Sequence, residues 1–437
     1  MKLILFAFFI LFGQINLKLT EKNPYDYSSY SSISTNENLE NSTVTSTSPD
    51  QNAVYITEAI SIKNALINKD SGDSSKTENS EFYGVNAAVL VQGGVLTMTG
   101  GQITTKAKGA NALVATNDGV VTITGTNITS QGSASARGLH STYGGTITGK
   151  EVTISTEGGS CATLATDRGE GVVSCEECNL STNGAGSPLI YSTGTITVKK
   201  TTGTAHKAQA VVVEGKNTAN VNENSELKCT AGPNRKEIDQ CGVMIYQSFS
   251  GDASVGTSNF NCADSSIEIL QSSDYYSTAP MFFVTNTNGN IKLNNCNFVY
   301  GSNKFLSLKG TSEWGRQGSN GGAVTLNITN QHIEGDFEVD GISSLTINMI
   351  NSDIKGKINT ANTAKQITIN IDKDSKITLT GNSYCNSIVN EDLTGANLVN
   401  GSYAWTIGGK SDTNSAKGIL GSNWILLSLS LIMGILL

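Results

Sequence analysis

The sequence predicts an all-β protein that folds as a right-handed parallel β-helix with three strands per coil and roughly a dozen coils. Three observations lead to this prediction. Short stretches of alternating apolar and polar residues recur every 25 or 26 residues, Gly, Asn, Asp and Ser separate them, and the repeat lacks the apolar spacing of a helix. With strands about 4.8 Å apart, the coils would form a rod on the order of 55–60 Å long.

The repeat is clearest around "GVVTITGTNITSQG" (119–132), which has near-copies on both sides. A single coil of this composition cannot bury its apolar residues, but stacked coils share one continuous core. Aligning the repeats predicts three rows of stacked side chains. These are Ile103, Ile128, Ile154 and Leu180; Leu96, Val121, Ile147 and Val173; and Leu90, Val114, His140, Leu164, Ile190 and Val212.

The two ends of the chain differ from the repeat. A basic residue followed by a short apolar run predicts a signal peptide over 1–20. Residues 21–52 are rich in Ser, Thr and Asn, so we expect a disordered leader there, open to O-glycosylation. The β-helix domain with its capping strands is expected over 53–400, and a tether over 401–414.

The C-terminal segment has the order of a signal for a glycosylphosphatidylinositol (GPI) anchor. Small residues at 414–416 precede a short spacer and a terminal apolar tail. We therefore expect attachment at Asn414, with Ser411 as the alternative, and removal of 415–437. A single-pass membrane anchor is the other interpretation, although no basic residues follow the tail. Either anchor places the protein at the extracellular face of the plasma membrane.

Cysteines and glycosylation sequons agree with secretion. The sequons are at Asn41, Asn127, Asn179, Asn327 and Asn400. The candidates for disulfides are Cys161, Cys175, Cys178, Cys229, Cys241, Cys262, Cys296 and Cys385.

The pairing of these cysteines stays open at the level of sequence. "CEEC" (175–178) favours a structural disulfide over a redox or metal motif, because neither a second motif of this kind nor a strand-to-helix context accompanies it. Cys229 has two candidate partners. Cys262 shares its phase on the next coil, and Cys241 would close the loop that interrupts the repeat.

Composition limits the classes of partner. The formal net charge is −8 and charged residues make up 15% of the chain, so a basic surface for nucleic acid is not expected. We expect neither a cofactor nor a metal site. The three histidines are isolated from any nucleophile in register, which argues against a hydrolytic triad.

The coils resemble those of a known class of proteins. Together with "DRGEG" (167–171), "GVMIYQSFSGDA" (242–253) and "GSNGG" (318–322), they are similar to right-handed parallel β-helix proteins of the secreted, pectate-lyase-like and adhesin-like type found in bacteria. The resemblance covers residues 84–382 and implies either adhesion or the processing of polysaccharides. The cysteines, the leader and the anchor signal depart from that class.

Two surfaces are candidates for binding. The turn after the first strand of successive coils carries Asp118, Tyr143 and the pair Asp167–Arg168, which could hold a sugar or a cation. The first strand is apolar on both faces, so its outer face is covered by the chain itself or is available to a partner; Tyr191 and Tyr246 mark it.

We expect a non-catalytic surface protein that recognises glycans, cells or neighbouring surface proteins. The alternatives are a polysaccharide lyase or hydrolase that uses the turn column, and a passive coat glycoprotein.

Overall fold

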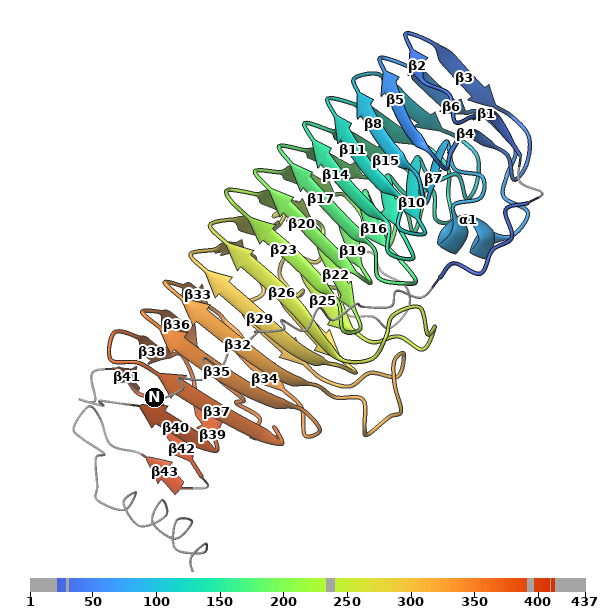
Figure 1. Ribbon diagram of the computed structural model, residues 1–437. Helices are drawn as coiled ribbons and strands as arrows, with labels where there is room; N and C mark the ends of the chain where they lie inside the picture. Colours follow the sequence, from blue (N-terminus) through green and yellow to red (C-terminus); the bar gives the residue numbers. More distant parts are fainter. Residues whose placement is uncertain (1–21, 29–30, 233–239, 391–396, 409, 413–437) are drawn as a thin grey trace, which may run out of the picture.

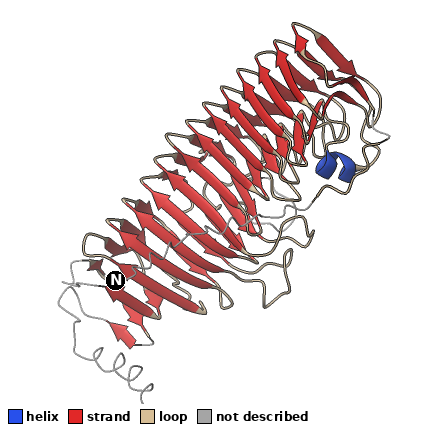
Figure 2. Ribbon diagram, in the orientation of Figure 1, coloured by secondary structure: helices blue, strands red, loops and turns tan. Residues whose placement is uncertain are grey.

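The protein is a rod of stacked parallel strands (Figure 1). The computed structural model describes residues 22–28, 31–232, 240–390, 397–408 and 410–412. Strands make up almost all of the regular structure in these residues, and the short helix α1 (Thr77–Tyr83) lies against the side of the rod (Figure 2). The predicted parallel β-helix is therefore confirmed.

Three long sheets run along the rod, one for each strand of the coil. Sheet A contains β1 (Ser32–Thr35), β4 (Asn52–Ile56), β7 (Val89–Gln92), β10 (Leu113–Thr116), β13 (Leu139–Ser141), β16 (Leu164–Thr166), β19 (Ile190–Ser192), β22 (Val211–Glu214), β25 (Val243–Tyr246), β28 (Phe282–Thr285), β31 (Lys304–Leu308) and β34 (Asp336–Val339). Sheet B contains β2 (Leu39–Glu40), β5 (Ala59–Lys63), β8 (Val95–Thr99), β11 (Val120–Thr124), β14 (Thr146–Lys150), β17 (Val172–Glu176), β20 (Thr195–Lys199), β23 (Thr218–Asn222), β26 (Thr257–Ala263), β29 (Asn288–Asn294), β32 (Ala323–Thr329), β35 (Ser344–Ile350), β37 (Gln366–Ile371) and β40 (Ser387–Asn390).

The third strand of each coil belongs to sheet C or, near the C-terminal end, to sheet D. Sheet C contains β3 (Thr43–Ser46), β6 (Leu66–Lys69), β9 (Gln102–Thr105), β12 (Asn127–Ser130), β15 (Thr153–Thr156), β18 (Asn179–Thr182), β21 (Thr202–Ala205), β24 (Glu226–Cys229), β27 (Ser266–Ile269) and β30 (Asn297–Val299). Sheet D contains β33 (His332–Glu334), β36 (Asp353–Gly356), β38 (Lys376–Leu379) and β41 (Leu398–Val399). A small sheet E contains β39 (Ser383–Cys385), β42 (Trp405–Ile407) and β43 (Lys410–Asp412).

Alternation of side chains builds the core from each coil. In β11, Val121 and Ile123 are buried while Thr122 is exposed, and in β12 Ile128 is buried. Ile128 pairs in register with Ile103 of the preceding coil, so like side chains stack along the rod. The hydrophobic effect thus acts between coils, which is why one coil alone would not fold.

Glycine comes immediately before the second strand of several coils, because the backbones of neighbouring coils approach closely there. A Cβ atom at Gly119 would meet the carbonyl oxygen of Val91, and one at Gly145 would meet that of Ala115. Both contacts are shorter than real Cβ contacts allow. The recurring glycine before each "VTIT"-like stretch is therefore a requirement of stacking.

The leader adds a coil to the rod, so the expectation of disorder over 21–52 is wrong where the structure describes it. Strands β1, β2 and β3 pair in parallel with β4, β5 and β6. Alternation is present but faint, since only Ser34, Val44 and Ser46 are buried in these strands. Pairing with the next coil orders a segment that has too few apolar residues to fold alone.

The expected tether is also ordered in part. Strand β42 pairs with β39 and with β43, and Trp405 is buried in the core cluster. Strands β42 and β43 therefore close the C-terminal end of the rod. Ser411 lies in β43, whereas the signal peptide, Asn414 and 415–437 lie outside the described residues. Among the described residues, no helix is long and apolar enough to cross a membrane.

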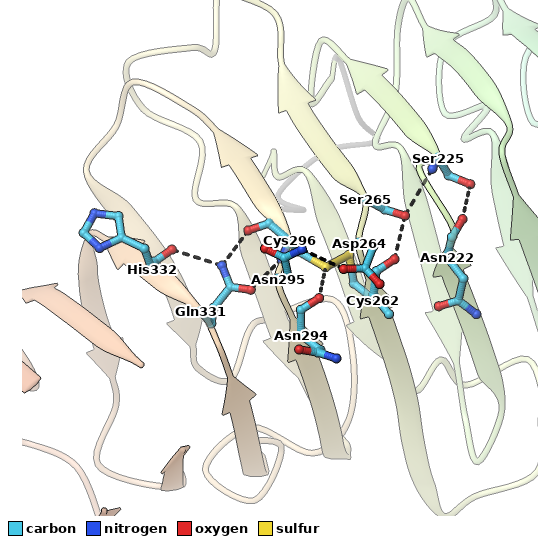
Figure 3. Close-up of a disulfide and its surroundings, with 11 residues drawn as sticks. Asn222, Ser225, Cys262, Asp264, Ser265, Asn294, Asn295, Cys296, Gln331 and His332 are labelled. Carbon is cyan, nitrogen blue, oxygen red and sulfur yellow. Dashed lines mark hydrogen bonds between the residues drawn. A yellow bond between two sulfur atoms is a disulfide. The ribbon is translucent and has the colours of Figure 1, made fainter. Parts of the chain in front are cut away.

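Two disulfides are present among the described cysteines. Cys175 and Cys178 pair within one turn, as "CEEC" predicts, and Cys262 pairs with Cys296 of the next coil (Figure 3). Neither pairing proposed for Cys229 is correct, because it is a buried free thiol. Cys229 ends a strand of sheet C whereas Cys262 lies in sheet B, so the two are on different sides of the rod.

The two disulfides should differ in their contribution to stability because they close loops of different length. Their sequence separations are 34 and 3. In the chain-entropy description, the double variant C262A/C296A should lose about 3–4 kcal/mol of unfolding free energy, and C175A/C178A about 2 kcal/mol. Urea denaturation of both double variants measures this. Equal losses would contradict the dependence on loop length.

Candidate functional site

Sheet A carries a row of mainly apolar side chains on its outer face. Backbone register gives this row as Leu90, Val114, His140, Ala165, Tyr191, Val212, Met244 and Phe283. The predicted row was wrong at Leu164 and Ile190. These two residues pair with each other, and with Leu139 and Val211, in the inward row. Successive coils differ in their number of residues here, so a row built from sequence intervals misplaces these two residues by one position.

Segments from outside the repeat cover the first coils of this face. Tyr27 of the leader packs against Leu90 and Val114. Its hydroxyl donates a hydrogen bond of 2.6 Å to the carbonyl oxygen of Tyr83, at the end of α1. The chain's own leader and helix therefore cover this part of the outer face. Coverage by the chain itself was one of the two predicted alternatives, and availability to a partner was the other.

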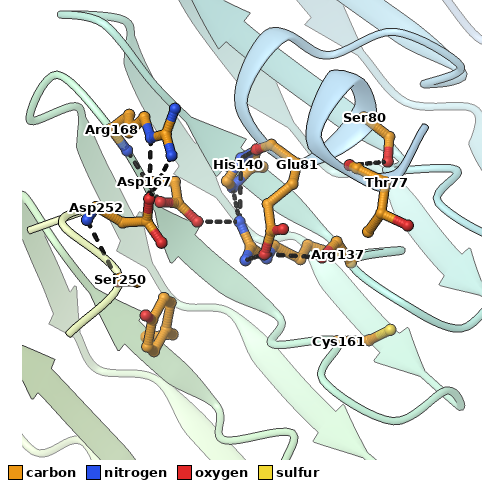
Figure 4. A network of polar contacts seen from close by, with 12 residues as sticks. Thr77, Ser80, Glu81, Arg137, His140, Cys161, Asp167, Arg168, Ser250 and Asp252 are labelled. Atoms are coloured by element: carbon orange, nitrogen blue, oxygen red, sulfur yellow. Dashed lines mark hydrogen bonds and ion pairs between the residues drawn. The ribbon is translucent and has the colours of Figure 1, made fainter. Parts of the chain in front are cut away.

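Beside this covered region, a buried polar network joins α1 to the coils (Figure 4). The guanidinium group of Arg137 bonds the carboxylate of Asp167 at 2.8 Å and that of Glu81 at 2.9 Å. His140 Nε2 lies 2.8 Å from the main-chain oxygen of Glu81. Because Glu81 belongs to α1, the arginine fastens the helix to the side of the rod.

Burial sets the protonation of this network. Burial raises the pKa of Asp167 to about 7, although the charge of Arg137 opposes this rise. Burial lowers the pKa of Arg137, but Asp167 and Glu81 outweigh it and the net direction is upward. Burial and the charge of Arg137 hold the pKa of His140 well below its usual value. His140 is thus a neutral, packed member of the network, as its place in an apolar row predicts.

The raised pKa of Asp167 predicts how stability depends on pH. The unfolded chain loses this proton near the ordinary value of 3.8, whereas the folded protein keeps it up to about 7. The contribution of Asp167 is therefore complete below the lower value and is lost as the pH rises through the upper one. We expect urea midpoints to fall across this range in the wild type and to fall less in Asp167→Asn. An identical slope in the variant would assign the effect elsewhere.

The turn column lies next to the network. The main-chain nitrogen of Asp118 donates to the oxygen of Tyr143 at 3.2 Å, and the nitrogen of Tyr143 donates to the oxygen of Arg168 at 2.7 Å. The guanidinium group of Arg168 bonds Asp252 at 2.8 Å and lies over the ring of Phe82, 3.8 Å from its centroid. Arg168 is therefore held between a loop and helix α1.

A pocket of about 410 Å³ opens on the outer face of sheet A, beyond α1. Its walls come from β19, β22 and β25, from the segments around these strands and before β13 and β16, from α1, and from the loop after β31. The lining residues are Glu81, Arg137, Ser160, Ala162, Gly186, Pro188, Tyr191, Gln209, Val212, Glu214, Met244, Tyr246, Ser248, Ser250, Asp252 and Trp314.

The carboxylate of Glu214 is central to this pocket. Its Oε2 atom accepts hydrogen bonds from the hydroxyls of Tyr191 at 2.5 Å and Tyr246 at 2.7 Å, and Oε1 accepts one from Ser248. Burial, and then the charge of Glu214, raise the pKa of both tyrosines well above the usual value, so both remain donors. The ring of Trp314 lies 5.1 Å from that of Tyr246, between centroids.

The six residues predicted for binding are divided between the pocket and its surroundings. Tyr191 and Tyr246 line it. Asp167 and Arg168 do not line it, but each forms an ion pair with a residue that does.

The other two predicted residues lie outside the lining. Asp118 is exposed in its turn, and the buried ring of Tyr143 stacks on Tyr83, with centroids 6.0 Å apart. The sequence did not identify the remaining polar and aromatic lining residues, because they lie far apart in the chain. Only Glu214 gave a signal, as an acidic residue at the end of the apolar stretch "AVVVE".

Four of the five sequons lie in turns or at the start of strands. Asn127 and Asn179 are exposed first residues of β12 and β18, in the same row two coils apart. Asn41 is exposed in a turn, and Asn400 is half-buried. Glycosylation at these positions stays a prediction.

The fifth sequon has a different environment. Asn327 is half-buried in β32, where its amide donates to Asn290 at 3.0 Å and accepts from Asn348 at 2.8 Å. A glycan on this nitrogen would remove a donor from a ladder of asparagine side chains.

Comparisons with known proteins identify no relative of this chain. No protein-family model matches the chain, and neither a curated protein nor a solved structure matches it.

Proposed function

We propose that this is a cell-surface recognition protein whose rigid β-helix presents a saccharide-binding pocket on the outer face of sheet A. The observation that carries the proposal is the pocket itself. It combines the rings of Tyr191, Tyr246 and Trp314 with a buried carboxylate and several side-chain amide and hydroxyl groups. Apolar walls with a few placed polar groups are typical of small-ligand sites.

Saccharides suit this combination of groups. The faces of sugar rings are apolar and pack on aromatic rings, whereas their hydroxyls need hydrogen-bonding partners, which Glu214 and Gln209 supply in this pocket. The lining strands belong to one continuous stack of coils, so the pocket is held on a stiff support. A preformed pocket binds with little loss of conformational entropy.

Binding without catalysis is the better-supported form of this function. Hydrolysis of a glycosidic bond requires one carboxylic acid that can donate a proton and a second carboxylate that acts as base or nucleophile. In the pocket, Glu81 pairs with Arg137, Asp252 pairs with Arg168, and Glu214 accepts three hydroxyl hydrogen bonds. Each of these three carboxylates is thus already engaged by protein groups, and none of the three is left free for either catalytic role.

The proposal includes display at the cell surface through a lipid anchor. Its support is the order of small residues, spacer and apolar tail at the C-terminus, with the N-terminal apolar run and the sequons. A phosphatidylinositol-specific phospholipase C should release the protein from cells. Retention on cells that release a control GPI protein would favour a spanning tail.

A glycan array tests the recognition function. The wild-type protein should bind a subset of glycans, and Trp314→Ala should lose that binding. Tyr403→Ala is a matched control, because this aromatic residue is 42% exposed near the C-terminal end of the rod, away from the pocket. Absence of binding by folded wild-type protein would favour a passive coat glycoprotein. Equal binding by all three proteins would place the site elsewhere.

A further inference from the structure

Glu214 stands apart from the other carboxylates of the pocket because of its charge environment. It is 1% exposed, and no basic side chain among the described residues forms an ion pair with it. Three hydroxyl donors compensate for part of the lost hydration of the carboxylate. Burial of an anion without a cation is unfavourable, so a positively charged ligand group would stabilise this arrangement.

Two tyrosines bond the same carboxylate, and a third aromatic ring lies against one of them. The hydroxyls of Tyr191 and Tyr246 meet at one oxygen of Glu214, so both rings extend outward from it. Trp314 adds a third ring, tilted by 57° to that of Tyr246. Faces of aromatic rings attract cations, and an aromatic enclosure with an acidic group is suited to an organic ammonium ion.

Neither Arg137, which lines the pocket, nor Arg168, which lies beside it, supplies the missing positive charge. Arg137 lies 5.7 Å from the centroid of the Tyr191 ring, but Asp167 and Glu81 both bond it. Arg168 is paired with Asp252. The two arginines are therefore paired with three carboxylates, those of Glu81, Asp167 and Asp252, and Glu214 is a fourth. The pocket region is negative even when Asp167 is protonated, and it disfavours an acidic ligand.

Gln209 offers a hydrogen-bonding partner for the neutral hydroxyl groups of a ligand. This side chain lines the pocket and is 4% exposed. Within the described residues, its amide nitrogen has only a weak contact, 4.0 Å from the sulfur of Met244. A buried amide without a strong partner is unfavourable unless a ligand completes its hydrogen bonds.

From these groups we infer that the pocket binds a saccharide unit with a free ammonium group, that is, a hexosamine that is not N-acetylated. The ammonium group bonds Glu214 between the aromatic rings, and the sugar hydroxyls bond Gln209. A pocket of about 410 Å³ is in the range for small ligands. This inference rests on the proposed function and names the ligand class of the same site.

Isothermal titration of the full-length protein in detergent tests this inference with four ligands. They are the glucosamine disaccharide, its N-acetylated form, cellobiose, and choline, at a pH where the sugar amine is protonated. We expect the glucosamine disaccharide to bind at least about tenfold more tightly than the N-acetylated form and cellobiose, from the added ion pair and cation–π contact. Choline separates the ammonium group from the sugar and should bind more weakly than the glucosamine disaccharide.

Substitution of Glu214 provides the second part of the test. Glu214→Gln keeps the shape and removes the charge, so the preference for the free amine should disappear while a weak affinity shared by all three disaccharides remains. Glu338→Gln is the matched control, because it removes the same charge from a side chain that is 51% exposed on β34. The ranking of ligands by the wild type is informative even if Glu214→Gln does not fold.

Each other outcome overturns a different statement. Equal binding of the free and N-acetylated disaccharides would leave a saccharide site and overturn the ammonium assignment. Tighter binding of choline than of the glucosamine disaccharide would overturn the hexosamine assignment. Preference retained by Glu214→Gln would overturn the role of that carboxylate. If no saccharide binds, the proposed function itself fails.

Discussion

Replacing Arg137 with methionine is expected to lower the free energy of unfolding by about 3–5 kcal/mol at neutral to mildly alkaline pH. The guanidinium group is buried and bonds two carboxylates, at 2.8 and 2.9 Å. Its removal leaves the buried Asp167 without a cation and frees Glu81 of α1. Urea denaturation followed by circular dichroism measures the loss.

A double variant separates the effect of the unpaired charge from that of packing. R137M/D167L removes both buried charges and should recover most of the stability that R137M loses, because apolar side chains of similar size replace an ion pair at little net cost. A double variant as unstable as R137M would show that packing of the arginine, rather than charge pairing, stabilises this region.

The second large effect is expected for Phe282→Ala, with a loss of about 3–5 kcal/mol. Phe282 is completely buried, and its ring lies 5.5 Å from Phe260, 5.5 Å from Phe298 and 5.2 Å from Phe305, between centroids. Truncation leaves a cavity among side chains from adjacent coils, which the stacked backbones cannot close. Val255→Ala, at an 83% exposed position, should change stability by less than about 0.5 kcal/mol. Similar losses in both variants, measured by urea denaturation, would contradict this view of the core.

The repeat made much of the fold predictable. Ile103, Ile128, Ile154 and Leu180 pair in successive strands of sheet C, as their intervals predict. The second predicted row, from Leu96 to Val173, is also in register in sheet B. Stacked backbones force equivalent residues of each coil into line, so periodicity in sequence translates directly into position in space.

The order of the leader and the position of the pocket were harder to predict from the sequence, because single, non-repeated segments form them. Around Ile33 and Leu39 of the leader, the alternation of apolar and polar residues is faint. Pairing with strands of the next coil orders this segment. Glu81 comes from the helix α1 insertion and Trp314 from a loop after β31. No rule of spacing joins two such insertions, because their meeting depends on how each folds back over sheet A.

Ligand-dependent fluorescence of Trp314 is the most direct test of a binding pocket on the outer face of sheet A. Each glycan that the array identifies would be titrated into wild-type protein and into Trp314→Phe, with binding followed independently by calorimetry. We predict a saturable change in emission of the wild type that is absent from the variant, together with weaker binding by the variant. A glycan that binds both proteins with equal affinity, without a signal from Trp314, would contradict the assignment of this pocket.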